Sequence, residues 1–244
     1  MTENICQELS LWGFIMRNDI YGMFCRLDSI TYNHSIRVMI LAKEFEEFTG
    51  QKDDILSQAA LMHDIGKVFI AEKILDKVDR LTNLEREMVS LHPYIGYQML
   101  KDLDINDDIC QIILYHHGKH PPTLKEIESV PTEEIYDRSL ILHTIDAFEA
   151  LTSDRPYHRG YDAMEAIDIM MREGNHHPAV MEYLIKTAEQ TSVKVSAVHR
   201  SHYMQDSTLI DVMLTNWQKK NMLLYDSGTH GMVINYSYAH EEVV

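Results

Sequence analysis

The sequence predicts an all-α protein, a helical bundle followed by a small C-terminal extension with β content. Two observations predict this class: apolar residues recur at helical spacing from about residue 33 to residue 190, and capping signals precede several of these runs. After residue 190 the apolar pattern becomes typical of strands. We therefore expect one domain over residues 1–190 and an extension over residues 191–244.

The first half of the predicted bundle begins with two apolar helical stretches. Residues 33–48 carry a broad apolar face, and Gly50 is a suitable stop for this helix. Residues 53–66 predict a second helix from the same kind of pattern. Thr82 and Glu85 have the spacing of a capping box, so we expect another helix to begin there.

Proline and asparagine mark the boundaries of the next helices. Pro93 disfavours helical geometry in the residue before it and suits the first turn of a helix. One helix should therefore end, and the next begin, at this point. Asn106 can cap a further helix that runs to His116 and His117, with Gly118 as its stop.

The second half of the bundle contains three more predicted helices. Residues 134–151 form a long apolar stretch that a turn at residues 153–156 should end. Asp162 followed by Glu165 should start the next helix, because this spacing again fits a capping box. Residues 178–190 predict the last helix of the bundle.

The C-terminal extension carries two strand-like patterns. Residues 193–197 alternate between apolar and polar side chains, the period of two that is typical of a strand. Residues 223–225 and 232–236 flank a short segment of turn-forming residues, which predicts a hairpin.

Composition and charge narrow the classes of function. With 45% hydrophobic and 25% charged residues, the 244-residue chain has the balance of a soluble globular protein. A net charge of −16 argues against a nucleic-acid polymer as partner, because such binding depends mainly on Lys and Arg. The apolar stretch over residues 11–16 is too short for a signal peptide core or a membrane span. We therefore expect a cytoplasmic protein without membrane contact.

Histidines and aspartates occupy positions where a helix ends or an apolar face is interrupted. A carboxylate within an apolar helix, such as Asp146, needs a partner, because burying it unpaired costs free energy. A metal ion is one such partner, whereas a histidine at a helix end can also simply interact with the helix dipole. The candidate metal ligands are His34, His63, Asp64, His92, His116, His117 and Asp146.

These candidates form a set of nitrogen and oxygen donors that suits iron, manganese, zinc or nickel. Two ions can share one carboxylate, and Asp64 is the candidate bridge. A pair of ions about 3.5–4 Å apart would activate a bridging hydroxide and hold a phosphoryl group for in-line attack. Lys67 lies one helical turn beyond Asp64, where it can steady a substrate phosphate. We assign Asp64 and Lys67 as the catalytic candidates.

The order of these residues resembles the HD superfamily of metal-dependent phosphohydrolases. It is most similar to the HD-GYP branch, whose members hydrolyse cyclic dinucleotides, chiefly cyclic di-GMP. The resemblance runs from about His34 to Glu182. Its densest segments are His63-Asp-Ile-Gly-Lys67, His92-Pro-Tyr-Ile-Gly96, Tyr115-His-His117 and Asp146-Ala-Phe-Glu-Ala-Leu-Thr-Ser-Asp-Arg-Pro-Tyr157.

The resemblance implies a helical bundle, a metal-dependent phosphodiesterase and the roles of nine residues. The seven candidate ligands take the family's metal-binding positions, and Lys67 and Arg155 match residues that contact the substrate phosphate. Members with three ions carry a glutamate four residues before the first histidine. Ile30 stands at that position here, so we expect two divalent transition-metal ions, iron or manganese.

One departure from the family leaves the substrate open. The family's Gly-Tyr-Pro loop should follow the paired histidines, but the sequence there is Gly118-Lys-His-Pro-Pro122. The leading expectation is hydrolysis of a cyclic dinucleotide, cyclic di-GMP first. The alternatives are another nucleotide or phosphate ester as substrate, or a non-catalytic module that binds metal or nucleotide and signals through a partner. The sequence also leaves the oligomeric state open, a homodimer included.

Overall fold

The computed structural model of the protein describes residues 18–51, 53–123, 130–154, 159–198, 224–225 and 232–233, and these residues confirm the all-α class. The helices are α2 (Asn18–Phe24), α3 (Ser29–Thr49), α4 (Ile55–Met62), the 3-10 helix η1 (Ile65–Phe69), α5 (Glu72–Leu75), α6 (Asn83–Ser90), α7 (His92–Asp102), α8 (Asp107–Tyr115), α9 (Glu133–Thr152), α10 (Ala163–Glu173) and α11 (Pro178–Val198).

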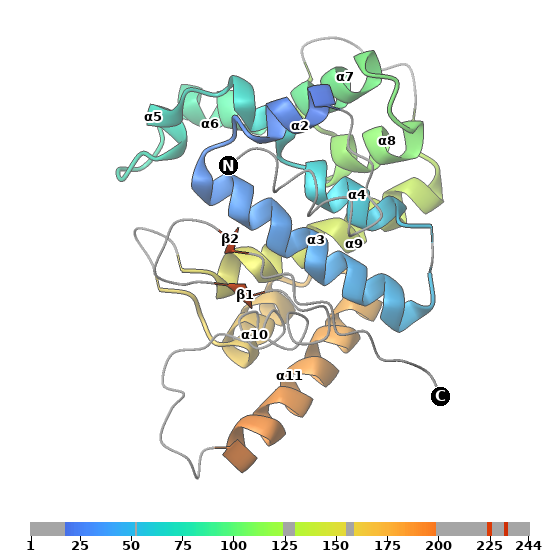
Figure 1. Cartoon of the computed structure of the whole chain (residues 1–244), viewed down its shortest axis with the longest axis vertical. Coiled ribbons are helices and arrows are strands. Elements are labelled where there is room, and N and C mark those ends of the chain that lie inside the picture. The colour runs from blue at the N-terminus through green and yellow to red at the C-terminus, as the bar shows by residue number, and fades with distance from the viewer. Residues whose placement is uncertain are drawn as a thin grey trace.

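The centre of the fold is a bundle built around α3, α4, α8 and α9. Helix α3 packs against α4 and α9, and α8 packs against α4, α7 and α9 (Figure 1). The apolar faces of these helices supply fully buried side chains, among them Phe45, Leu61, Ile112 and Phe148. Burial of this apolar surface is the main term that stabilises the bundle.

The predicted capping signals are confirmed. Thr82 and Asp162 each form a complete capping box with the glutamate three residues later, at the starts of α6 and α10. Asn106 Oδ1 accepts a hydrogen bond from the backbone N–H of Asp108 (2.8 Å) at the start of α8. Gly50 ends α3 in the left-handed region, at φ 76°.

The helix predicted over residues 53–66 is wrong at its C-terminal end. Helix α4 ends at Met62, the chain turns at His63 and Asp64, and η1 follows. The break has a packing reason, because η1 lies tightly against α7. A Cβ atom on Gly66 would lie only 2.1 Å from the carbonyl oxygen of His92.

The strand predicted over residues 193–197 is also wrong, since α11 continues to Val198. Extending an existing helix needs no new nucleation, so five alternating residues do not suffice to end it. The predicted hairpin is confirmed where the structure describes it. Strand β1 (Leu224–Tyr225) pairs antiparallel with β2 (Met232–Val233). The division into two units at residue 190 remains a proposal.

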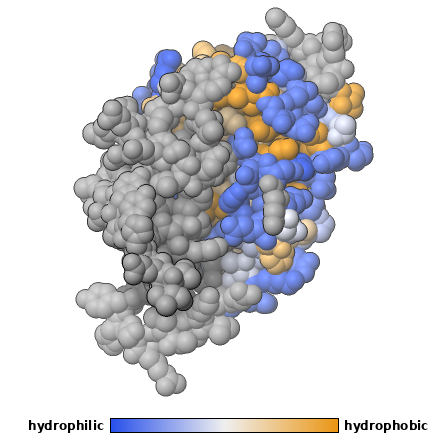
Figure 2. All heavy atoms as spheres, turned by 45° about the vertical axis from the view of Figure 1, so that its right-hand side comes forward, coloured by the Kyte–Doolittle hydropathy of each residue, from blue (hydrophilic) through white to orange (hydrophobic). Residues whose placement is uncertain are grey.

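The described surface is mixed in polarity. On the face in Figure 2, hydrophilic residues predominate and hydrophobic ones gather mainly in its upper part. Within the ranges that the structure describes, no helix combines the length with the apolarity that crossing a bilayer requires.

A buried carboxyl group on α3 gives the first prediction, on stability. Glu46 is 1% exposed; its Oε1 accepts a hydrogen bond from the backbone N–H of Ser57 (3.2 Å), and its Oε2 has no hydrogen-bond partner among the described residues. Burial raises the pKa of the Glu46 carboxyl, so the folded protein holds this proton more tightly than the unfolded chain. The stability that this proton confers is therefore present at low pH and lost as pH rises through the folded pKa.

The variant Glu46→Gln should raise the free energy of unfolding at pH 8 by about 1 kcal/mol, because glutamine keeps the acceptor for Ser57 without a charge. The gain should shrink toward pH 4. Urea denaturation at both pH values measures it, with Glu47→Gln on the exposed side of α3 as control. Equal stability of Glu46→Gln and wild type at pH 8 would contradict the prediction.

Candidate metal centre

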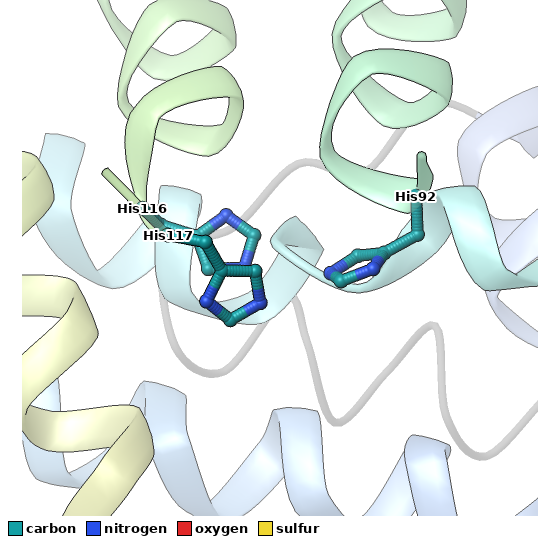
Figure 3. Close-up of side chains that lie close together, drawn as sticks. All are labelled: His92, His116 and His117. Atoms are coloured by element: carbon teal, nitrogen blue, oxygen red, sulfur yellow. The ribbon is translucent and has the colours of Figure 1, made fainter. Parts of the chain in front are cut away.

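The structure brings the seven predicted ligand residues together at one end of the bundle. They come from α3, the turn between α4 and η1, the start of α7, the end of α8 and the middle of α9. Figure 3 shows His92 at the start of α7 facing His116 and His117 at the end of α8. His117 is exposed and Asp146 is half-buried, whereas the other five are buried: His34 (7%), His63 (1%), Asp64 (2%), His92 (4%) and His116 (1%).

Three of the histidines are held in one orientation by backbone carbonyl groups. In each, Nδ1 donates a hydrogen bond to the carbonyl oxygen three residues earlier, in the last turn of a helix. The pairs are His63 with Ala60 (2.7 Å), His92 with Val89 (2.8 Å) and His116 with Ile113 (2.6 Å). The last carbonyls of a helix have no partner within the helix, so they are free to accept. The proton on Nδ1 leaves the lone pair of Nε2 available to a metal.

Asp64 lies between two groups of histidines. Its Oδ1 is 3.1 Å from Nε2 of His92. Its Oδ2 is 3.5 Å from Nε2 of His63 and 3.7 Å from Nε2 of His34. One carboxylate oxygen therefore faces each group, which is the arrangement that a bridging ligand needs. Nζ of Lys67 lies 2.6 Å from Oδ2, so Lys67 stands at the same carboxylate.

His34 is held by two carboxylates of α9. Its Nε2 is 3.0 Å from Oδ1 of Asp146, and its Nδ1 hydrogen-bonds with Oε2 of Glu149. Glu149 was not among the residues selected from the sequence. A signal was present, since Glu149 is a carboxylate in the same apolar stretch as Asp146, three residues further on.

The electrostatics of the histidines differ with their surroundings. Burial lowers the pKa of His63 and His116, so both rings are neutral at neutral pH, the form that binds metals. Burial also opposes protonation of His34, but its hydrogen bonds with Asp146 and Glu149 outweigh burial and raise its pKa to about 10. Without a bound metal ion the ring of His34 is therefore protonated, and an ion that binds at its Nε2 would displace the proton held there.

The residues fit a centre for transition-metal ions. Nε2 of His116 is buried and has no hydrogen-bond partner in the described part of the chain. A metal ion would satisfy this lone pair, which otherwise costs free energy. Donor atoms lie within 4.8 Å of one another in three overlapping groups: His92 with His116 and His117; His34 with His63 and Asp64; His63 with His116 and Asp146.

A cavity of about 320 Å³ opens beside these donors. This volume is at the lower end of the range for small-molecule sites, about 300–1,000 Å³. His34, Asp64, His117, Asp146 and Lys67 line it, so four of the seven predicted ligands and one predicted phosphate contact face the same space. Ile30 lines the same cavity. Arg155, the other predicted phosphate contact, lies outside the described residues.

Comparison with known proteins identifies the family of this chain. The model of the HD domain matches residues 31–151, a span that contains all seven predicted ligands. The chain belongs to the HD domain family. This confirms the resemblance to the HD superfamily that the sequence motifs indicated.

Relatives of the chain are named as cyclic-dinucleotide phosphodiesterases. A cyclic di-GMP phosphodiesterase of Pseudomonas aeruginosa is 32% identical over 164 residues, which cover 65% of this chain and 39% of that protein. A cyclic di-GMP phosphodiesterase of Thermotoga maritima is 31% identical over 195 residues, 74% of this chain and 50% of that protein. A 3'3'-cGAMP-specific phosphodiesterase of Vibrio cholerae is 34% identical over 125 residues, 51% of this chain and 26% of that protein. The matched regions thus span half or less of these relatives.

Proposed function

We propose that this HD-domain chain is a metal-dependent phosphodiesterase that hydrolyses a cyclic dinucleotide, with cyclic di-GMP as the first candidate. The observation that carries the proposal is the clustering of seven histidine and aspartate side chains, four of which line one cavity. The Nδ1 atoms of three of the histidines are hydrogen-bonded to backbone carbonyls. The names of the relatives support the substrate class.

Two ions, iron or manganese, would be held by two groups of side chains. His34, His63 and Asp146 form one group, and the second consists of His92, His116 and His117. Asp64 would serve both, because one of its oxygens faces each group. When bound, such ions supply Lewis acidity toward a phosphoryl oxygen and lower the pKa of an attacking water.

The chain's own groups would bind and orient the phosphodiester. Lys67 lines the cavity, and its ammonium group has three N–H donors, of which Asp64 needs one. The remaining donors can hold a phosphate oxygen beside the ions. Arg155 is the second candidate for this task on the strength of the family motif. No side chain in this scheme needs to act as a covalent nucleophile.

The replaced Gly-Tyr-Pro loop motivates the alternatives. Gly118 to Pro122 follow directly on the ligands His116 and His117, so a different loop can change which substrate enters without changing the metal ligands. Another nucleotide or phosphate ester is therefore the second candidate substrate. The third candidate is a non-catalytic module that binds metal or nucleotide, and the clustering of all seven predicted metal ligands weighs against it.

The test is hydrolysis by protein reconstituted anaerobically with Fe(II) or Mn(II). Cyclic di-GMP, 3'3'-cGAMP and a panel of phosphate esters are offered in parallel, and products are separated by chromatography. We expect linear dinucleotide from the wild type and none from His116→Ala. The matched control is His177→Ala, because the ring of His177 contacts Asp137 (3.1 Å) outside the cavity. Metal-loaded protein that leaves both cyclic dinucleotides intact would refute the proposal. Activity toward another ester alone would favour the second candidate.

A further inference from the structure

Glu149 is a fully buried carboxylate whose two oxygens both have partners. Its side chain is 0% exposed, and Oε2 accepts a hydrogen bond from Nδ1 of His34. Oε1 accepts hydrogen bonds from Nε of Arg37 and from Oγ of Ser153 (2.5 Å for the latter). Burying such a charge network adds little to stability compared with apolar residues of similar volume. The fold alone therefore gives no reason for this network.

The position of His34 explains why it needs a partner from another helix. The other three buried histidines follow the last turn of a helix, where free carbonyls can fix Nδ1. His34 instead lies in the second turn of the 21-residue helix α3. There the carbonyl three residues earlier accepts an N–H within the helix. A local carbonyl thus cannot fix this ring as it fixes the others.

We propose that Glu149 is the positioning residue of the metal centre: it holds the proton on Nδ1 of His34 and thereby directs the lone pair of Nε2 toward the ions. Glu149, 115 residues away in sequence, accepts the hydrogen bond from Nδ1 of His34. In His63, His92 and His116 the backbone carbonyl three residues earlier accepts this bond. Arg37 and Ser153 keep the carboxylate in place from its other oxygen. The inference rests on the metal centre of the proposed function, but not on its substrate.

A carboxylate behind a ligating imidazole also raises the basicity of the ligand. Loss of such an outer partner costs about 10–100-fold in metal affinity. Glutamine at position 149 would present either its oxygen or its amide group to His34. The amide group donates, so it would favour the tautomer with the proton on Nε2, where the metal should bind.

The experiment is a calorimetric titration of the metal-free protein with Mn(II), which measures the affinity for the ion. We expect Glu149→Gln to weaken binding about 10–100-fold, and Glu149→Asp to recover part of the loss. Glu44→Gln is the matched control, since Glu44 is a half-buried carboxylate of α3 that accepts a hydrogen bond from Tyr183 (3.0 Å) outside the centre. Its Mn(II) affinity should equal that of the wild type.

A double-mutant cycle separates positioning from a general structural role. In a His34→Ala background, Glu149→Gln should change Mn(II) affinity no further, because the ring that it positions is gone. An equal loss with and without His34, or unchanged affinity in Glu149→Gln itself, would overturn the inference. Failure of the wild type to bind Mn(II) would instead refute the metal centre of the proposed function, so the two failures are distinguishable.

Discussion

Replacing Asp64 by asparagine should give the largest loss of metal binding and activity of any single substitution in the centre. The side chain keeps its volume and loses its charge, so the bundle should still fold. Asp64 is the residue with an oxygen toward each group of histidines, 3.1 Å from Nε2 of His92 and 3.5 Å from Nε2 of His63. One substitution therefore weakens both ion positions at once.

The expected size of the loss in Asp64→Asn follows from comparison with substitutions of residues that only support a ligand. Loss of an outer-shell partner alone costs about 10–100-fold in metal affinity or activity, and a shared ligand should cost more. We expect Asp64→Asn to retain less than about 1% of wild-type turnover and to bind fewer ions per chain, measured by elemental analysis after dialysis.

The control is a second aspartate that contacts a histidine outside the cavity. Asp137 Oδ1 lies 3.1 Å from Nε2 of His177. Asp137→Asn removes a charge from an aspartate–histidine contact without touching the centre, so its metal content should match the wild type. Full metal content in Asp64→Asn would show that Asp64 does not bridge the ions.

The sequence could predict the seven histidines and aspartates that cluster in the structure because each of them departs from its local surroundings. A histidine at a helix end, such as His92, or a carboxylate in an apolar helix, such as Asp146, departs from the surrounding pattern. Capping residues were equally visible, and α6 and α10 start where Thr82 and Asp162 predicted. Each of these signals depends on residues fewer than about five positions apart.

The features that the sequence did not predict depend on distant contacts. The partner of His34 is 115 residues away, and periodicity carries no information about which of several buried acids lies opposite a ring. The break after Met62 likewise follows from the approach of η1 to α7. The apolar pattern predicted a helix to residue 66, although Asp64 and Gly66 are both poor helix formers.

The close packing of η1 against α7 depends on Gly66, and Gly66→Ala gives the second large prediction. An added Cβ would lie 2.1 Å from the carbonyl oxygen of His92 and 2.7 Å from the backbone nitrogen of Gly96. Both are backbone atoms, so neither can move aside as the end of a flexible side chain can. Either η1 or α7 must shift, and Asp64 precedes η1 while His92 begins α7.

We therefore expect Gly66→Ala to lose both stability and metal affinity. Overpacking costs about 1–3 kcal/mol, and a backbone clash should reach about 3 kcal/mol in the free energy of unfolding, measured with urea on metal-free protein. Gly22→Ala on α2 is the matched control, because no atom of the described chain lies within 4 Å of its added Cβ. Removing a glycine from that helix should, if anything, stabilise the protein. If Gly66→Ala matched Gly22→Ala in stability and in Mn(II) affinity, the contact between η1 and α7 would not be what sets the distance between Asp64 and His92.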